Sequence, residues 1–135
     1  MITLVDTGPL VALYHRDDSA HEACVAALRR LRGTLLTTWH VVTEAVHLLG
    51  FSHAAQDAVL STIERGVLRI APLDDKDVPR IRELMEKYKD HPMDLADATL
   101  VRVAERERLS VVFTLDRNDF GVYRMSRKRP FKLIP

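Results

Sequence analysis

The 135-residue sequence predicts an α/β protein: a three-layer α/β/α sandwich with a mainly parallel central sheet, formed by one domain over residues 1–135. Short apolar runs rich in β-branched residues alternate along the chain with segments whose apolar residues recur at helical spacing. Most consecutive strands are therefore separated by a helix, which is the pattern of parallel strands joined by crossover helices. No repeat, linker or low-complexity segment divides the chain.

Five segments are predicted as strands from their apolar composition and from the turn residues that bound them. In chain order they are residues 1–5, 35–38, 67–73, 111–115 and 131–134. The first run ends on Asp6, and the fourth ends on Asp116. We expect both acids at the carboxyl edge of the sheet, which is where open parallel sheets bind their ligands.

The helices are predicted from apolar periodicity and from capping and stop signals at their ends. In chain order they begin at Pro9, at a Ser19–Glu22 capping box, at Val41, at a Ser52 cap, at Asp77 with Pro79, and at an Asp94 cap that follows a break at Pro92. The helix that begins at Val41 carries Glu44 opposite a face of apolar residues. Asp94 and Asp97, three positions apart in the first turn of the last helix, project from one side of it.

The charge balance excludes a generic binder of nucleic acid or membrane. The chain has 20 Lys and Arg against 19 Asp and Glu, a formal net charge of +1. The last fifteen residues hold five basic and no acidic side chains: Arg124, Arg127, Lys128, Arg129 and Lys132. This basic tail is expected either to hold RNA phosphates or to form a solvated or subunit-interface segment.

Cysteine usage and hydropathy predict a cytoplasmic protein. Cys24 is the single cysteine, so the chain cannot form an internal disulfide or a paired-cysteine metal site. No apolar stretch approaches the roughly 18 residues of a membrane span, and the N-terminus lacks the basic segment of a signal peptide.

Five carboxylates occupy positions that can face one crevice: Asp6, Glu44, Asp94, Asp97 and Asp116. Each has an ordinary structural explanation when it is taken alone, as a helix cap, a helix-dipole partner, a turn former or a solvated side chain. Together they would repel one another unless a cation lay between them. Oxygen ligands without Cys or His favour Mg²⁺ or Mn²⁺.

Two other patterns offer alternatives. His40, Glu44 and His47 share one helix face and could hold Zn²⁺ or Mn²⁺, but their spacing differs from the zinc-protease motif, and solvated histidines are the commoner explanation. Trp39, at the start of the same helix, is expected in the core or in an interface.

The triplet Asp6-Thr7-Gly8 is like the catalytic triplet of aspartic proteases, although those enzymes are all-β and this chain carries many helical patterns. No glycine-rich phosphate loop occurs, so the sequence does not support nucleoside-triphosphate or dinucleotide chemistry.

Four segments in order resemble the PIN-domain ribonucleases of the VapC toxin type over nearly the whole chain. These segments are Val5-Asp6-Thr7, Glu44 in its apolar helix, Asp97-Ala98 within residues 95–100, and residues 114–120 with the sequence TLDRNDF. The resemblance implies that Asp6, Glu44, Asp97 and Asp116 form an acidic quartet, with Thr114 as the hydroxyl residue before the last acid and Asp94 in support.

The same resemblance implies a PIN-like fold and a metal-dependent endoribonuclease. Mg²⁺ or Mn²⁺ would be held by the quartet, and the products would carry a 5′-phosphate and a 3′-hydroxyl. The substrate would be an RNA such as tRNA, rRNA or mRNA. The partners would be a second copy of the chain, in a homodimer, and a small antitoxin of the VapB type whose C-terminal segment occupies the acidic groove.

Two alternatives remain beside this expectation. A non-catalytic PIN-like module could bind RNA or a protein without cleaving, although such modules tend to lose acids that are all present here. Cleavage of DNA flaps belongs to larger relatives with an added arch, for which 135 residues leave no room.

Overall fold

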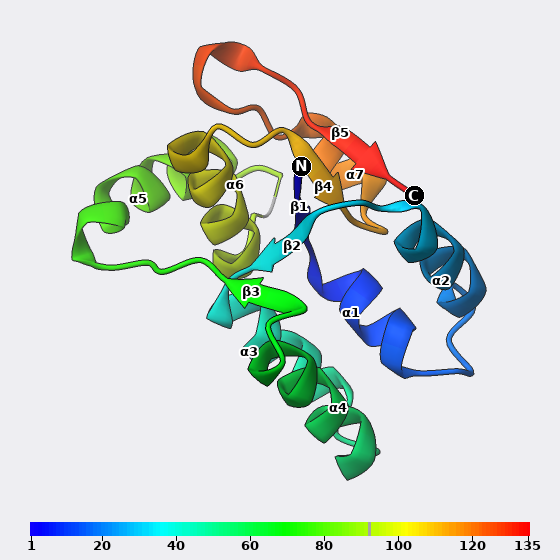
Figure 1. Ribbon diagram of the computed structural model, residues 1–135. Helices are drawn as coiled ribbons and strands as arrows, with labels where there is room; N and C mark the ends of the chain where they lie inside the picture. The colour runs from blue at the N-terminus through cyan, green and yellow to red at the C-terminus, as the bar shows by residue number, and fades with distance from the viewer. Residues whose placement is uncertain (92) are drawn as a thin grey trace.

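The computed structural model describes residues 1–91 and 93–135 (Figure 1), so Pro92, the predicted break, lies outside the described residues. Within this part of the chain, five strands form one sheet with the order β3-β2-β1-β4-β5, and all four neighbouring pairs are parallel. The strands are β1 (Ile2–Val5), β2 (Thr34–Thr37), β3 (Leu68–Ile70), β4 (Val111–Phe113) and β5 (Lys132–Ile134). The predicted α/β class is confirmed, although β3 and β4 end earlier than the sequence predicts.

The helices are α1 (Thr7–Tyr14), α2 (His21–Arg30), α3 (Trp39–Leu48), α4 (His53–Glu64), α5 (Val78–Lys87), α6 (Leu95–Glu107) and α7 (Arg117–Val122). Two short 3-10 turns, η1 (Asp75–Asp77) and η2 (Ser126–Lys128), precede α5 and β5. Helix α7 has no counterpart among the helices predicted from the sequence. The Ser52 and Asp94 caps are confirmed, since each side chain accepts a hydrogen bond from a backbone N–H of the first helical turn.

The predicted Ser19–Glu22 capping box is wrong. Helix α2 begins at His21, its N-cap is Ala20, and no side chain caps it. The turn before the helix is held instead by Asp18, whose carboxylate accepts a 2.9 Å hydrogen bond from the backbone N–H of Ala20. An Asp side chain that accepts a hydrogen bond from the backbone N–H two residues ahead commonly stabilises a turn. Here this turn takes the place of the predicted Ser19 cap.

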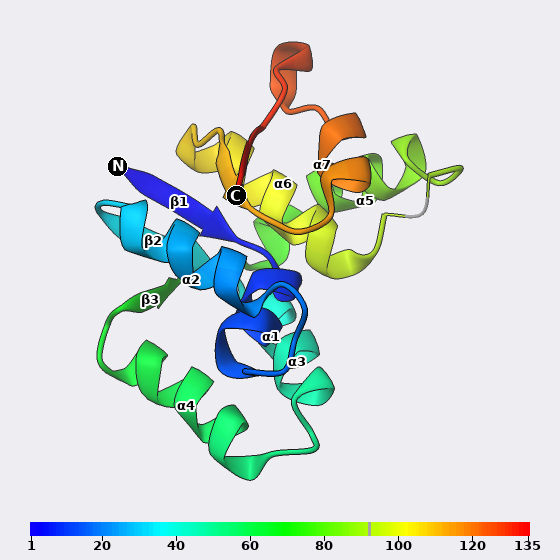
Figure 2. The same ribbon diagram turned by 90° about the vertical axis from the view of Figure 1, so that its right-hand side faces the viewer.

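The strand order places a topological switch point beside β1. The chain passes from β1 outward through β2 to β3, and then returns to place β4 on the other side of β1. In Figures 1 and 2, α5 and α6 lie on one side of the sheet and α1 and α2 on the other, which gives the three layers. In open parallel sheets, ligands bind outside the carboxyl ends of the strands at such a switch point.

A buried hydroxyl pair joins the two helices that carry Glu44 and Asp97. The side-chain oxygens of Thr38 and Thr99 are 2.9 Å apart, and neither residue is accessible to solvent. Thr38 also caps α3, and Thr99 donates to the carbonyl of Ala96. Because a buried hydroxyl without a partner costs about 1–3 kcal/mol, this pair favours one alignment of α3 against α6.

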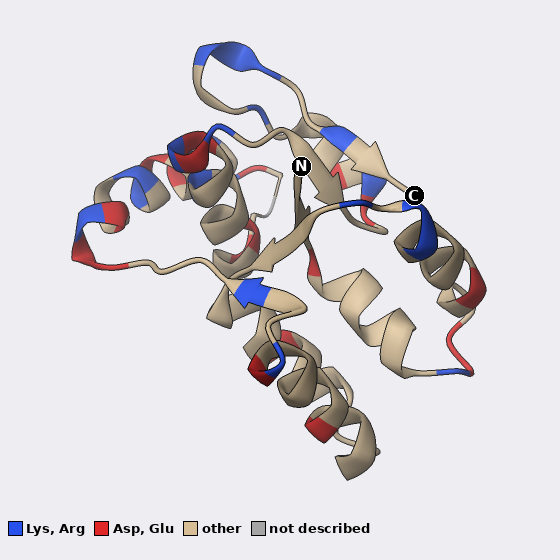
Figure 3. Cartoon of the chain, viewed as in Figure 1, with Lys and Arg blue, Asp and Glu red and all other residues tan. Residues whose placement is uncertain are grey.

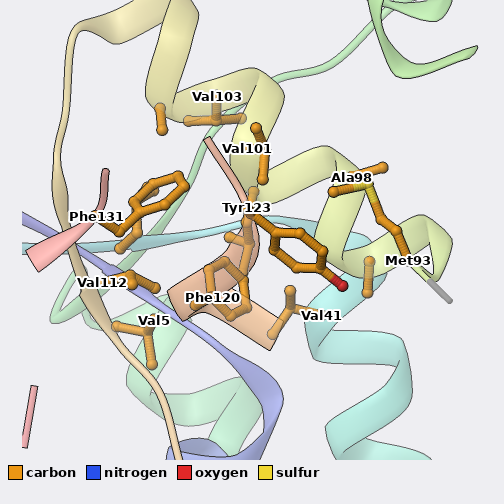
Figure 4. Packing of buried hydrophobic residues seen from close by; sticks show 14 of the residues in the cluster. Val5, Val41, Met93, Ala98, Val101, Val103, Val112, Phe120, Tyr123 and Phe131 are labelled. Atoms are coloured by element: carbon orange, nitrogen blue, oxygen red, sulfur yellow. The ribbon is translucent and has the colours of Figure 1, made fainter. Parts of the chain in front are cut away.

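The core beneath the switch point is built around aromatic rings that lie in α7 and after it. Figure 4 shows Phe120, Tyr123 and Phe131 packed against Val101 and Val112. The ring centroids of Phe120 and Tyr123 are 5.2 Å apart in an edge-to-face arrangement. This arrangement stabilises an aromatic pair in addition to the contribution of its buried area. Trp39 lies outside this core, and 54% of it is exposed. Of the two positions expected for Trp39, the core is therefore wrong, and the interface stays a prediction.

Across residues 1–91 and 93–135, no helix has both the length and the apolar character that crossing a membrane requires.

Candidate active site

A groove of about 500 Å³ opens at the carboxyl edge of the sheet. It brings together all five carboxylates that the sequence singles out, and it adds two more. The acids that line it are Asp6, Asp18, Glu44, Asp94, Asp97, Asp116 and Asp119. In the described part of the chain, no Lys or Arg lines this groove. Figure 3 shows acidic positions directly after β1 and between β4 and α7.

Asp6 and Asp116 reach the groove because β1 and β4 are neighbours. The backbone N–H of Asp6 donates to the carbonyl of Phe113 over 2.9 Å, which extends the ladder one step past β1. Asp6 is 6% exposed, and its carboxylate leaves the start of α1 uncapped. Its side chain therefore faces the groove. A side chain that capped α1 would instead lie against the first turn of that helix.

Thr114 connects the two acids through its side chain, one residue past the end of β4 at Phe113. The buried Thr114 hydroxyl donates to Oδ2 of Asp6 over 2.8 Å and accepts from the backbone N–H of Asp116 over 3.0 Å. One hydroxyl thereby fixes both the Asp6 carboxylate and the turn that carries Asp116.

The first turn of α6 supplies two acids with different surroundings. Asp94 is exposed, and its Oδ1 accepts a 2.8 Å hydrogen bond from the backbone N–H of Asp97, so it is both a helix cap and a wall of the groove. Asp97 is more enclosed, and its Oδ2 accepts a 2.9 Å hydrogen bond from the hydroxyl of Tyr123. The two acids are thus close in sequence but are held by different groups.

Glu44 and Asp116 complete the walls of the groove from two other helices. Glu44 projects from α3, and its Oε2 accepts a 3.3 Å hydrogen bond from Thr7 at the start of α1. Asp116 caps α7 by accepting from the backbone N–H of Asp119 over 2.9 Å. The carboxylate of Asp119 lies 2.6 Å from Nε2 of His91.

The electrostatics of the groove disfavour a full set of negative charges. Burial raises the pKa of Asp6 to about 6, with the charges of Asp94 and Glu44 adding to the effect and the Thr114 hydrogen bond opposing it. Burial and the neighbouring charges of Asp6 and Asp94 raise the pKa of Asp97 to about 8. A neighbouring cation would favour the ionised form of each carboxylate and would therefore lower its pKa.

The donor set fits a hard divalent cation, since every charged group in the lining is a carboxylate. As they are placed, the carboxylates line the groove without converging on one point. Among residues 1–91 and 93–135, no three His, Cys, Asp or Glu side chains are gathered closely enough to hold an ion. Mutual repulsion keeps like charges apart, and a cation is the ligand that would allow them to approach.

His40 and His47 do not enter the acidic groove. They line a neighbouring hollow together with Thr43, Glu44, Asp94, Leu95 and Ala96. With no three-residue metal cluster in the part of the chain that the structure describes, the zinc interpretation of this helix face gains no support.

The basic tail also lies outside the groove, because none of its five basic side chains is part of the lining. The guanidinium of Arg124 donates to the backbone carbonyls of Gly121 and Tyr123 over 2.6 and 2.9 Å. Arg127, Lys128, Arg129 and Lys132 are exposed.

Sequence reasoning misses Tyr123, Asp18 and the pairing of Asp119 with His91. No local sequence motif distinguishes Tyr123 from the other aromatic residues of its buried segment. Its hydroxyl meets Asp97 across 26 positions of sequence, and only the packing of the segment after β4 against α6 brings the two together.

The fold and the groove define an α/β protein with an acidic groove at the switch point of a parallel sheet. This architecture excludes the all-β aspartic protease alternative. Residues 3–125 match the PIN domain family, and the chain belongs to that family.

Related proteins agree with this assignment. The chain is 27% identical over 134 residues to Ribonuclease VapC26 of Mycobacterium tuberculosis, covering 98% of this chain and 99% of that protein. Among solved structures it is similar to VapC20 of Mycobacterium tuberculosis, described as a Sarcin-Ricin loop cleaving toxin, with a TM-score of 0.75 and 20% identity over 87% of this chain and 92% of that one. It is also similar to VapBC2 from Rickettsia felis bound to a promoter DNA fragment, with a TM-score of 0.69, 15% identity and full coverage of both chains.

Proposed function

We propose that this PIN-domain protein is a metal-dependent endoribonuclease that acts as the toxin of a toxin-antitoxin pair. The observation that carries the proposal is the groove at the switch point, which collects seven carboxylates and, in the described residues, no basic side chain. Membership of the PIN family and the likeness to Ribonuclease VapC26 support it.

The cation is Mg²⁺ or Mn²⁺, held by Asp6 and Asp97, with Glu44 and Asp116 completing the site and Asp94 beside it. When bound, such an ion lowers the pKa of a water molecule and stabilises the negative charge that develops on the phosphate and on the leaving oxygen. The hydroxyls of Thr114 and Tyr123 hold the carboxylates of Asp6 and Asp97 in place.

The reaction breaks the bond between phosphorus and the 3′ oxygen and forms a new bond from phosphorus to a water oxygen. Glu44 and Asp116, which both line the groove, orient the attacking water and accept the proton that it loses, and the freed 3′ oxygen takes up a proton. The products carry a 5′-phosphate and a 3′-hydroxyl. Without a cation the groove would repel the RNA backbone, so substrate binding and catalysis depend on the same ion.

The decisive experiment uses the purified full-length chain and a 5′-labelled structured RNA, with MgCl₂ or MnCl₂ in one arm and EDTA in the other. We expect cleavage only with the cation, 5′-phosphate ends in the product, and loss of cleavage in Asp6→Asn and Asp97→Asn. Full cleavage by the metal-free protein would contradict the proposal. RNA binding without cleavage in every arm would favour the non-catalytic module.

Sequencing the 5′-phosphate ends that accumulate when the protein is expressed would then identify the RNA that it cuts. The buried free Cys24 and an RNA substrate both fit a reducing compartment, so we place this activity in the cytoplasm.

The partners are a VapB-type antitoxin and a second copy of the chain. A partner segment that carries a basic side chain suits the acidic groove, and co-expression with the neighbouring reading frame should suppress the nuclease activity. Trp39 and Leu95, each about half exposed, border two hollows that both include His40. We assign this apolar surface to the homodimer. Light scattering should give twice the chain mass, and Trp39→Glu should give a monomer.

A further inference from the structure

Two acids of the groove, Asp6 and Asp97, are each held by one buried hydroxyl group. Thr114 donates to Oδ2 of Asp6 over 2.8 Å, and Tyr123 donates to Oδ2 of Asp97 over 2.9 Å. Among the hydrogen bonds of the described residues, Oδ1 of Asp6 and Oδ1 of Asp97 accept none from a side chain. The carboxylate of Asp97 therefore keeps Oδ1 available to the groove, whereas the Asp6 carboxylate also lies beside the backbone N–H of Thr7.

The hydroxyl of Tyr123 is held rigidly because its ring is enclosed by other rings. Tyr123 has no accessible surface. Its ring lies edge to face with Tyr88, Phe120 and His91, at centroid distances of 5.1, 5.2 and 5.9 Å. Figure 4 shows the ring inside the hydrophobic cluster with its oxygen at the end that faces Val41 and Met93. A ring packed on several sides gives the hydroxyl little freedom to leave Asp97.

We propose that Tyr123 is a positioning residue for the cation site: it fixes Asp97 by one oxygen so that the other is presented to the metal ion. This inference rests on the proposed metal-dependent function. Partners that hydrogen-bond a metal-ligating carboxylate typically contribute 10- to 100-fold to metal affinity. Removing the Tyr123 hydroxyl should therefore weaken cation binding while leaving the chemical step, at saturating cation, close to its original rate.

The chain offers a matched control in Tyr88, which belongs to the same aromatic cluster. Its hydroxyl also makes one partly buried hydrogen bond, but it accepts from the backbone N–H of Arg124 over 2.8 Å and does not bond to a groove acid. Tyr88→Phe and Tyr123→Phe remove the same atom from neighbouring rings. Only the second change removes a hydrogen bond to a proposed metal ligand.

The experiment titrates MnCl₂ alone into the purified chain by isothermal calorimetry, with no RNA present. The proteins compared are wild type, Tyr123→Phe, Tyr88→Phe and Asp97→Asn. Circular dichroism and thermal melting in EDTA check that each variant is folded. We expect Mn²⁺ affinity to fall about 10- to 100-fold in Tyr123→Phe, to stay within about twofold of wild type in Tyr88→Phe, and to be lost in Asp97→Asn. Activity of Tyr123→Phe should recover as MnCl₂ is raised.

The outcomes separate this inference from the proposed function. If wild type binds Mn²⁺ and Asp97→Asn does not, but Tyr123→Phe binds like wild type, the positioning role is wrong and the metal site stands. Equal weakening in Tyr88→Phe would assign the effect to ring packing and would also overturn the role. If wild type itself binds no Mn²⁺, the metal-dependent function fails and this inference fails with it.

Discussion

The hydroxyl of Thr114 donates a 2.8 Å hydrogen bond to the carboxylate of Asp6 across 108 positions of sequence. Both residues are buried, and the bond joins the ends of two neighbouring strands at the point where the winding of the sheet reverses. A carboxylate at that point needs a donor if it is to remain ordered and partly charged. Thr114 is that donor.

Replacing Thr114 by Val removes the donor while it nearly preserves the shape of the side chain. We expect Thr114→Val to lose about 1–3 kcal/mol of unfolding free energy, because the Asp6 carboxylate and the Asp116 N–H both lose a buried partner. Nuclease activity should fall as well. Thr114→Ser, which keeps the hydroxyl, is the control for chemical denaturation and RNA cleavage. Equal behaviour of the Val and Ser variants would show that the hydrogen bond does not matter.

Asp97→Asn should show opposite stability effects with and without a cation. In EDTA the variant should melt at or above the wild-type temperature, because each close pair of carboxylates costs roughly 1–4 kcal/mol at an effective dielectric near 20. In excess MgCl₂ the wild type should melt higher, since it gains stability from an ion that the variant binds weakly. Scanning calorimetry in both buffers measures this. Parallel shifts in the two buffers would contradict the acidic metal site.

Asp94→Ala should affect stability more than catalysis. Asp94 caps α6 through the backbone N–H of Asp97, and loss of such a cap costs about 1 kcal/mol. Cleavage should fall much less than in Asp97→Asn when both variants are assayed well below their melting temperatures. A loss of activity as large as that of Asp97→Asn would place Asp94 among the metal ligands.

Asp77 gives a prediction about acid stability that is independent of the groove. Burial tends to raise its pKa, but the backbone hydrogen bond at Asp74, the hydrogen bond from Arg102 and the charge of Arg106 outweigh burial and hold the pKa below its usual 3.8. A lowered pKa in the folded state stabilises the protein above the pKa of the unfolded chain. This stabilisation is lost as the pH falls through the folded value.

Asp77→Asn should therefore cost about 1–3 kcal/mol near neutral pH, because two guanidinium groups lose their charged partner. The difference from wild type should shrink as the pH falls below about 4. Urea denaturation at pH 7 and at pH 3 measures both values, and Asp75→Asn, on the exposed side of the same turn, is the control. A difference that is the same at both pH values would show that the charge of Asp77 is not responsible.

The basic tail is predicted either to bind RNA phosphates or to form a solvated or subunit-interface segment, and the salt dependence of RNA binding distinguishes these. The test variant replaces Arg127, Lys128, Arg129 and Lys132 by Gln. If these residues bind phosphates, the slope of log K against log salt should flatten by nearly one unit for each phosphate that is no longer neutralised, whatever the RNA sequence. Arg29→Gln with Arg30→Gln is a control of exposed arginines elsewhere. An unchanged slope with a changed elution volume would assign the tail to an interface.

The sequence by itself determines the parts of this protein that depend on short-range signals. The strands follow from β-branched runs, and α6 follows from its Asp94 cap and the apolar spacing after it. The acids after the first and fourth strands can be found in the same way, since a carboxylate within a few residues of the carboxyl end of a strand lies at that edge of a parallel sheet. Glu44 stands out as the one carboxylate on a helix whose other face is apolar.

The tertiary structure alone decides which of these elements become neighbours. Local patterns do not specify that β4 returns beside β1, that Trp39 remains at the surface, or that α2 begins without the Ser19 cap. The contact between Tyr123 and Asp97 depends on the packing of the aromatic cluster against α6. Caps and periodicity act over a few residues, whereas these arrangements are chosen by side-chain packing summed over the whole core.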